Sequence, residues 1–305
     1  MPIPVIAIFG PTGVGKTAVA VELADRLRER GRDPVAISAD ALQVYEGIET
    51  ITGAASSADR ERLEHRLIGY VSLQEEYSAG RYMERAHAEI DAALADGRTP
   101  IVVGGTGLYL RAALADLDLA PAPPPELRAR LEQRALDEGA PALHAQLLAA
   151  EPGLAARIEP GDGKRLVRTL ELLEMGHRPP APADDSQLWT SDTRHPTLLV
   201  GLTMDREALY AAIDKRVDAM VAAGAAGEAR AAQAAGISRT ARYALGFHEL
   251  LAGDIDGMKR RTRNYARRQL TWMRKLDGVR LTDVTGRAPG PLAASVARAA
   301  DMDLD

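Results

Sequence analysis

A glycine-rich turn near the start of the chain constrains the fold more than any other feature. Residues 10–17 read Gly-Pro-Thr-Gly-Val-Gly-Lys-Thr and fit the phosphate-loop pattern G-x-x-x-x-G-K-[ST] at every defined position. The preceding residues 3–9 are apolar and β-prone, and residues 18–30 carry apolar side chains at helical spacing. A strand, a loop and a helix in this order predict an α/β fold whose first strand ends in an anion-binding loop.

The residues of this loop are suited to hold a diphosphate or a triphosphate. Its glycines let the backbone wrap closely around an anion, and Lys16 adds a positive charge. The hydroxyl of Thr17 can ligate Mg²⁺. The alternative is a turn that only joins strand and helix. The candidate diphosphate-binding residues are therefore Gly10, Pro11, Thr12, Gly13, Val14, Gly15, Lys16 and Thr17.

Composition excludes several classes of protein. The chain has 305 residues, 46% of them hydrophobic, which is ordinary for a globular protein with a sizeable core. It contains no cysteine, which excludes disulfides, thiolate catalysis and cysteine-ligated metal sites. Because neither a signal peptide nor a bilayer-spanning apolar run is recognisable, we expect a cytoplasmic protein.

The ends of two further predicted strands add candidate site residues. The apolar run 35–38 leads to Asp40, and residues 100–103 run into Gly-Gly-Thr-Gly, which includes Thr106. Open α/β sheets bind ligands at the carboxyl ends of their strands, so Asp40 is a candidate Mg²⁺ ligand, general base or helix N-cap. A phosphate-loop hydrolase usually has a carboxylate where this second strand ends in glycine. The glycines either admit a ligand close to the backbone or only make a tight turn.

Two proline clusters predict the domain organisation. Residues 120–125 and 178–182 are rich in proline and flank a block that is helical in pattern. We therefore predict a P-loop α/β core, with a parallel sheet flanked by helices, formed by residues 1–120 and 190–305. The inserted helical domain would span residues 121–189.

Residues 259–275 form a predicted helix with eight basic residues and no acidic one. One side of this helix carries residues at spacings of three or four, and we expect this side to pack against the rest of the protein. These residues are Met258, Thr262, Tyr265, Gln269, Trp272 and Leu276. We expect an exposed track of Arg260, Arg263, Arg267 and Arg274 on the other side. In a chain of net charge −5 this helix predicts a nucleic-acid contact, with a solvated helix face as the alternative.

Together these motifs resemble the tRNA dimethylallyltransferase (tRNA isopentenyltransferase) family across nearly the whole chain. The matching motifs are the phosphate loop, Asp-Ala-Leu-Gln-Val-Tyr from Asp40, and Val-Gly-Gly-Thr-Gly-Leu-Tyr-Leu from Val103. The resemblance continues at residues 162–171, Arg216, 245–249 and 262–272. It implies transfer of a dimethylallyl group from dimethylallyl diphosphate to N6 of the tRNA adenosine on the 3′ side of the anticodon, with release of pyrophosphate. It also implies a Mg²⁺ cofactor, and we expect a monomer without membrane association.

The resemblance further implies roles for individual residues. Arg216 would contact the diphosphate, Asp40 would accept the N6 proton as general base, and Thr106 would lie close to the reacting centre. Gln43 and its neighbours would read the flipped base, whereas the basic residues would mainly contact phosphates of the anticodon arm. The implied tRNA-binding residues are Asp40, Ala41, Leu42, Gln43, Thr106, Arg128, Asp162, Lys164, Arg165, Arg168, Arg263 and Arg267.

The chain departs from the family pattern on the acceptor side. Ala41 replaces a serine, residues 47–55 lack a threonine–alanine–lysine run, and residues 175–179 replace Thr-Gly-Lys-Pro. An adenylate isopentenyltransferase acting on free AMP or ADP is therefore one alternative, although it needs no basic helix. A P-loop small-molecule kinase that binds ATP and a non-catalytic RNA-binding protein are the others.

Overall fold

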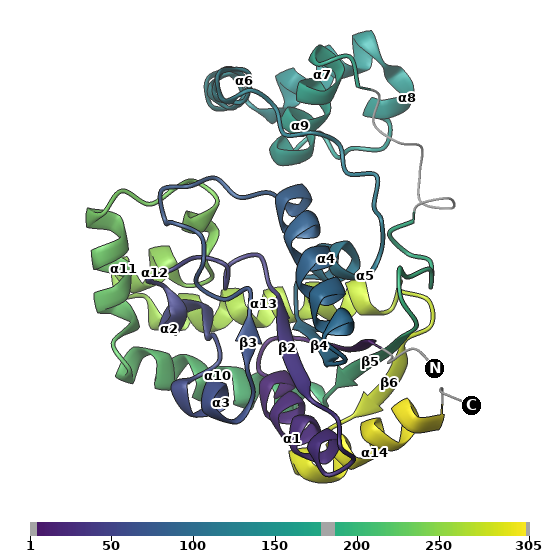
Figure 1. The fold of residues 1–305 in the computed structure, drawn as a ribbon. Helices are drawn as coiled ribbons and strands as arrows, with labels where there is room; N and C mark the ends of the chain where they lie inside the picture. Colours follow the sequence, from purple (N-terminus) through teal and green to yellow (C-terminus); the bar gives the residue numbers. More distant parts are fainter. Residues whose placement is uncertain (1–4, 178–186, 303–305) are drawn as a thin grey trace. The chain divides into compact units, whose positions relative to one another are not determined.

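The computed structural model describes residues 5–177 and 187–302 (Figure 1). The chain falls into two compact units, one formed by residues 1–117 and 187–305 and the other by residues 118–186. The first proline cluster lies in the smaller unit and leads into its first helix. The second, residues 178–182, lies outside the described residues.

A six-stranded sheet forms the centre of the larger unit, and all of its strand pairs are parallel. Its strand order is β3-β2-β4-β1-β5-β6. The strands are β1 (Val5–Phe9), β2 (Pro34–Ala39), β3 (His65–Arg66), β4 (Thr99–Gly104), β5 (Thr197–Thr203) and β6 (Arg280–Asp283). Strands β1 and β2 are buried along their whole length, as expected for apolar strands covered on both faces.

The register of the sheet brings three loops together. Ile8 of β1 lies opposite Val103 of β4, and Val103 lies opposite Ser38 of β2. The carboxyl ends of β2, β4 and β1 therefore stand side by side, and so do the segments that follow them. This arrangement confirms the predicted parallel α/β sheet flanked by helices.

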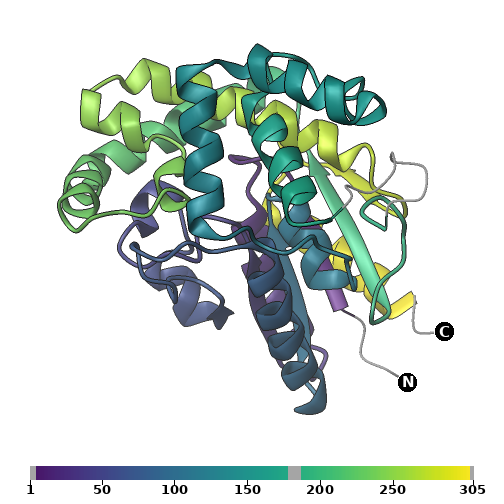
Figure 2. The same cartoon turned by 90° about the horizontal axis from the view of Figure 1, so that it is seen from above.

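Helices cover both faces of this sheet (Figures 1 and 2). Helix α1 packs on α14 at one face and α4 packs on α5 at the other, while α13 contacts α5, α10 and α12. The helices of this unit are α1 (Lys16–Arg28), α2 (Glu49–Thr52), α3 (Ser57–Arg62), α4 (Ala79–Ala95), α5 (Gly107–Leu114), α10 (Arg206–Ala222), α11 (Ala225–Ala234), the 3₁₀ turn η2 (Ala241–Tyr243), α12 (Phe247–Ala252), α13 (Ile255–Met273) and α14 (Pro289–Met302). In the part of the chain that the structure describes, no helix has the length and apolar character of a membrane span.

The smaller unit is helical and has a leucine-rich core of its own. Its helices are α6 (Pro125–Asp137), α7 (Ala140–Ala150), α8 (Pro152–Ala155) and α9 (Gly163–Glu174). The core contains Leu131, Leu143, Leu147, Leu154, Leu166 and Leu170. Asp162 caps α9, because its side chain accepts a hydrogen bond from the Arg165 backbone amide at 3.1 Å.

A buried carboxylate joins α6 and α9 within this unit. Glu171 is fully buried and accepts hydrogen bonds from Arg128, at 2.6 and 2.8 Å, and from Arg168, at 3.2 Å. Arg168 also donates to the carbonyls of Ala120 and Pro121. Two of the arginines expected to contact tRNA are thus engaged in ion pairs inside their own unit.

We expect the substitution Glu171→Gln to destabilise the helical unit by about 2 to 3 kcal/mol, because it removes the buried carboxylate that the Arg128 and Arg168 guanidinium groups share. Hydrogen exchange of the peptides that cover α6 and α9 measures this effect. Glu174→Gln on the same helix is the matched control, since its exposed pair with Arg130 is worth at most about 1 kcal/mol. Equal protection in both variants would contradict a stabilising role for Glu171.

Candidate active site

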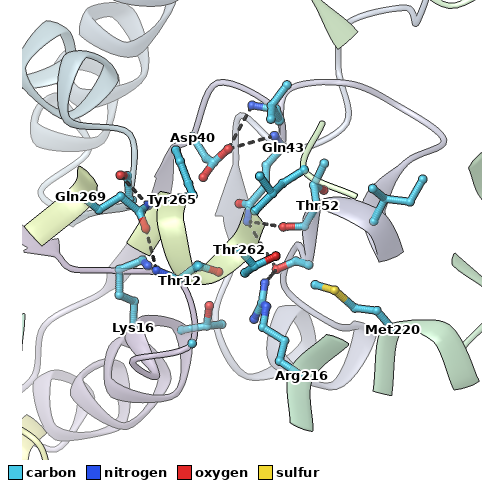
Figure 3. Close-up of a pocket in the computed structure, with 18 of the residues that line it drawn as sticks. Thr12, Lys16, Asp40, Gln43, Thr52, Arg216, Met220, Thr262, Tyr265 and Gln269 are labelled. Carbon is cyan, nitrogen blue, oxygen red and sulfur yellow. Dashed lines mark hydrogen bonds between the residues drawn. The ribbon is translucent and has the colours of Figure 1, made fainter. Parts of the chain in front are cut away.

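A cavity of about 330 Å³ lies where the carboxyl ends of β1, β2 and β4 meet (Figure 3). The phosphate loop forms one wall, and Arg216 of α10 faces it. Apolar side chains form another part of the lining: Leu42, Ile51, Val217, Met220, Leu245 and Met258. Among the described residues, the carboxylates that line the cavity are Asp40 and Asp59. The cavity therefore joins a cationic region to an apolar one.

The phosphate loop has the backbone that its glycines permit. Gly13 and Gly15 have positive φ angles of 84° and 93°, which a residue with a side chain rarely adopts. The Lys16 ammonium group donates to the carbonyls of Gly10 and Pro11 at 2.9 and 3.0 Å. An ammonium group has three N–H donors, so one remains for a ligand. Thr17 lies on the first turn of α1 and also lines the cavity.

Arg216 provides a second cation. Its Nη2 donates to the carbonyl of Gly53 at 3.0 Å, which holds the side chain in the cavity wall. Its Nε is buried and has no hydrogen-bond partner in the described part of the chain. A buried donor without a partner costs free energy unless a ligand satisfies it, so this atom marks a position for an acceptor such as a phosphate oxygen.

Burial disfavours the charged forms of both cations. Burial, together with the nearby charge of Arg216, lowers the pKa of Lys16 to about 7. Burial likewise lowers the pKa of Arg216. Asp40 lies close enough to oppose both shifts, while burial raises the pKa of its own carboxyl group. An anion bound between Lys16 and Arg216 would favour their charged forms.

The two carboxylate oxygens of Asp40 differ in their hydrogen bonding. Its Oδ1 accepts hydrogen bonds from the backbone amides of Leu42, at 3.0 Å, and Gln43, at 3.4 Å. Residues 41–44 form turns and not a helix, so Asp40 stabilises the turn after β2 and is not a helix N-cap. No hydrogen bond within the described residues engages Oδ2, and Asp40 lines the cavity. The same carboxylate is placed to fix its own loop and to accept a proton.

Thr106 lies behind the cavity wall and not in its lining. Its hydroxyl accepts a hydrogen bond from the Ala41 backbone amide at 3.3 Å and lies 3.3 Å from the Tyr265 hydroxyl. It therefore connects the loop after β2 to α13. The side chain of Gln43 is also engaged, since it accepts from the Ser38 hydroxyl at 3.0 Å and donates to the Gly53 carbonyl at 3.3 Å.

The exposed track predicted for the basic helix is confirmed for Arg260, Arg267 and Arg274, which are exposed, but not for Arg263. Arg263 is half-buried and forms an ion pair with Asp214 of α10, and Lys259 pairs with Asp218. Arg260 and Arg261 pair with Asp254 and Glu249. Among the described residues, the positive charges of α13 that lack a carboxylate partner are in its second half and just beyond it: Arg267, Arg268, Arg274 and Lys275.

A family model described as IPP transferase matches residues 43–276. The chain belongs to the IPP transferase family. It is 40% identical over 286 residues to a tRNA dimethylallyltransferase of Kineococcus radiotolerans, covering 90% of this chain and 88% of the relative. It is 43% identical over 291 residues to one of Rhodospirillum centenum, covering 89% and 88%. The family resemblance predicted from the motifs is confirmed.

Solved structures of similar proteins share the fold of this IPP transferase. A tRNA isopentenylpyrophosphate transferase of Bacillus halodurans aligns with a TM-score of 0.70 and 31% identity, over 99% of this chain and 97% of that one. A eukaryotic dimethylallyltransferase acting on tRNA aligns with a TM-score of 0.73 and 27% identity, over 92% of this chain and 74% of that one.

The Lys16 ammonium group in the cavity should lower the free energy of unfolding, by an amount that depends on pH. Because the pKa of Lys16 falls from 10.5 to about 7 on folding, the unfolded chain binds more protons between these pH values. The cost is thus fully present below pH 7 and declines as the pH rises towards 10.5. Lys16→Met should therefore raise the unfolding temperature at about pH 6, and raise it less at about pH 10.

Thermal unfolding of the wild type and of Lys16→Met at both pH values measures this difference. Lys215→Met, which removes an exposed cation from α10, is the control and should change the unfolding temperature little at either pH. A gain for Lys16→Met that is equal at both pH values would contradict the shifted pKa.

Proposed function

We propose that this IPP transferase transfers a dimethylallyl group from dimethylallyl diphosphate to N6 of the tRNA adenosine on the 3′ side of the anticodon. The observation that carries the proposal is the composition of the cavity. Lys16 and Arg216 suit a diphosphate, the wall around Met220 suits an apolar chain, and Asp40 suits a general base. The names of the relatives, tRNA dimethylallyltransferase, supply the acceptor class.

The reaction breaks the bond between the allylic carbon and the diphosphate oxygen, forms a bond between that carbon and N6, and transfers one N6 proton to a base. The allylic carbon leaves the diphosphate oxygen, which keeps the electron pair, and bonds to the adenine N6 nitrogen, which loses one proton. Lys16, Arg216 and the loop amides stabilise the charge that develops on the departing pyrophosphate. Oδ2 of Asp40 accepts the proton, and the raised pKa of the carboxyl group makes it a stronger base.

The end of β4 favours prenyl transfer over phosphoanhydride hydrolysis. It carries Gly104 and Gly105 where a phosphate-loop hydrolase would hold a carboxylate for Mg²⁺ and water. The other cavity carboxylate, Asp59, is engaged in a capping box with Ser56.

The residues present fit a Mg²⁺ ion that is shared with the diphosphate. Thr17 offers a hydroxyl beside Lys16, and Mg²⁺ in phosphate sites takes few protein ligands besides phosphate oxygens and water. Within residues 5–177 and 187–301, no group of three or more His, Cys, Asp or Glu residues could hold a metal alone. The ion, when bound, would neutralise charge on the diphosphate.

We assign the tRNA contacts to three groups of residues. Gln43, with Ala41 and Leu42, would lie near the flipped adenine, since the loop after β2 borders the cavity. In the helical unit, Lys164 and Arg165 are exposed at the first turn of α9, whereas Arg128 and Arg168 would have to share their guanidinium groups with Glu171. On α13, Arg267 is exposed whereas Arg263 is bound to Asp214.

The test is product analysis after incubation with Mg²⁺, with three acceptor and donor combinations in parallel. Labelled dimethylallyl diphosphate is offered with unmodified tRNA or with AMP, and γ-labelled ATP is offered with AMP as a small-molecule acceptor. We expect label on tRNA only when dimethylallyl diphosphate is the donor. We also propose that the enzyme is a cytoplasmic monomer, so the reaction should need neither a membrane nor a second protein chain. Label on AMP instead of tRNA would mean that the departures at Ala41 and residues 47–55 changed the acceptor, and phosphoryl transfer from ATP would mean a kinase.

A further inference from the structure

Gln269 of α13 links two loops that border the cavity (Figure 3). Its side-chain oxygen accepts a hydrogen bond from the backbone amide of Thr12, in the phosphate loop, at 2.8 Å. Its side-chain nitrogen donates to the carbonyl of Gly105, after β4, at 2.7 Å. The residue is only 4% exposed, so these bonds are shielded from competing water.

The pair of hydrogen bonds requires an uncharged side chain that has both a donor and an acceptor. Thr12 presents a donor and Gly105 presents an acceptor, and a carboxamide carries one partner for each. Position 105 has no room for a side chain beside this amide. A Cβ atom on Gly105 would lie 2.3 Å from the Gln269 side-chain nitrogen and 3.3 Å from the Lys16 ammonium nitrogen. The glycine after β4 therefore makes room for this amide and for the lysine.

The same face of α13 also supports the loop that carries Asp40. Tyr265 lies one helical turn before Gln269, and its hydroxyl is 3.3 Å from the Thr106 hydroxyl, which accepts from the Ala41 amide. One helix thus contacts the loop that would bind the diphosphate and, through Thr106, the loop that carries the candidate base.

We propose that Gln269 is a positioning residue: it anchors the phosphate loop to α13 and so keeps the loop in its diphosphate-binding geometry. The inference rests on the proposed function of the cavity as a diphosphate site. Gln269 also lines the cavity, but both of its polar atoms are bonded to Thr12 and Gly105, so its contribution is the placement of the remaining loop amides and of Lys16. Placement errors of about 1 Å at such a site can cost about 100-fold in rate.

Two variants of nearly unchanged size test the proposal. Gln269→Met removes both hydrogen bonds, and Gln269→Glu keeps the acceptor but places a carboxylate against the Gly105 carbonyl. Pyrophosphate affinity, measured by calorimetry without tRNA, should fall about tenfold or more in both variants. The KM for dimethylallyl diphosphate should rise in parallel, while the dissociation constant for tRNA should stay within about twofold. Gln233→Met, at an exposed glutamine of α11, is the control.

A pH series separates positioning from a general loss of structure. When protonated, the carboxyl group introduced by Gln269→Glu can again accept from Thr12 and donate to Gly105. Its pyrophosphate affinity relative to the wild type should therefore recover as the pH falls from about 8 to about 5, whereas Gln269→Met should show no recovery. If either variant fails to fold, as judged by circular dichroism, the other still gives the affinity result.

The outcomes distinguish this inference from the proposed function. Wild-type protein that binds no pyrophosphate would overturn the diphosphate site itself, and the role of Gln269 with it. Wild-type binding together with unchanged affinity in both variants would overturn only the role of Gln269.

Discussion

Replacing Asp40 by asparagine is expected to lower kcat for transfer to tRNA by about 10²- to 10⁴-fold. Asparagine retains a side-chain oxygen that can accept from the Leu42 and Gln43 amides, so the loop after β2 should keep its conformation. It lacks a basic oxygen for the N6 proton, so only the proton transfer should suffer. Steady-state kinetics at saturating tRNA and donor measure the loss.

Pyrophosphate affinity serves as the internal control for Asp40→Asn. It should not decrease, because the substitution removes a negative charge from a site for an anion. Near-normal turnover with intact donor binding would show that another group, or solvent, accepts the proton.

Replacing Arg216 by glutamine is expected to lower kcat/KM for dimethylallyl diphosphate by about 10²- to 10³-fold. The guanidinium group combines a positive charge in the cavity wall with a buried Nε donor that lacks a partner in the described residues, and glutamine replaces neither. The effect should appear both in pyrophosphate affinity and in kcat, since the negative charge of the diphosphate grows as it leaves.

Lys215→Gln is the matched control for this substitution, because it removes a neighbouring cation on the exposed side of the same helix. Its kcat/KM should stay within about twofold of the wild type. If both variants behaved alike, Arg216 would act only through the overall charge of α10 and not through contact with the diphosphate.

Much of the donor side of the site is predictable from the sequence because its signals are local. The phosphate loop is contiguous, and Asp40 follows directly after a buried strand. The parallel pairing of β2, β4 and β1 then brings these segments together at one edge. Helical spacing also identified the packed side of α13 correctly, with Met258, Thr262 and Gln269 buried.

Residues whose partners are distant in sequence could not be assigned in this way. Periodicity predicts that Gln269 packs inward, but its partners are 257 and 164 residues away. The count of charges within α13 likewise overlooked Asp214, which lies 49 residues before Arg263 and neutralises it. Glu171 similarly engages Arg128 from another helix, 43 residues away. Local patterns predict burial and charge, whereas the choice of partner depends on tertiary packing.

Mapping of the modified nucleotide tests the central claim most directly. Purified protein is incubated with dimethylallyl diphosphate, Mg²⁺ and an unmodified tRNA, and the tRNA is then digested and its fragments are weighed by mass spectrometry. A second tRNA, with guanosine in place of the adenosine on the 3′ side of the anticodon, is the matched control. We expect the mass of one dimethylallyl group on the fragment that contains this adenosine, and no gain on the control tRNA. Modification of another adenosine, or equal modification of both tRNAs, would contradict the proposed reaction.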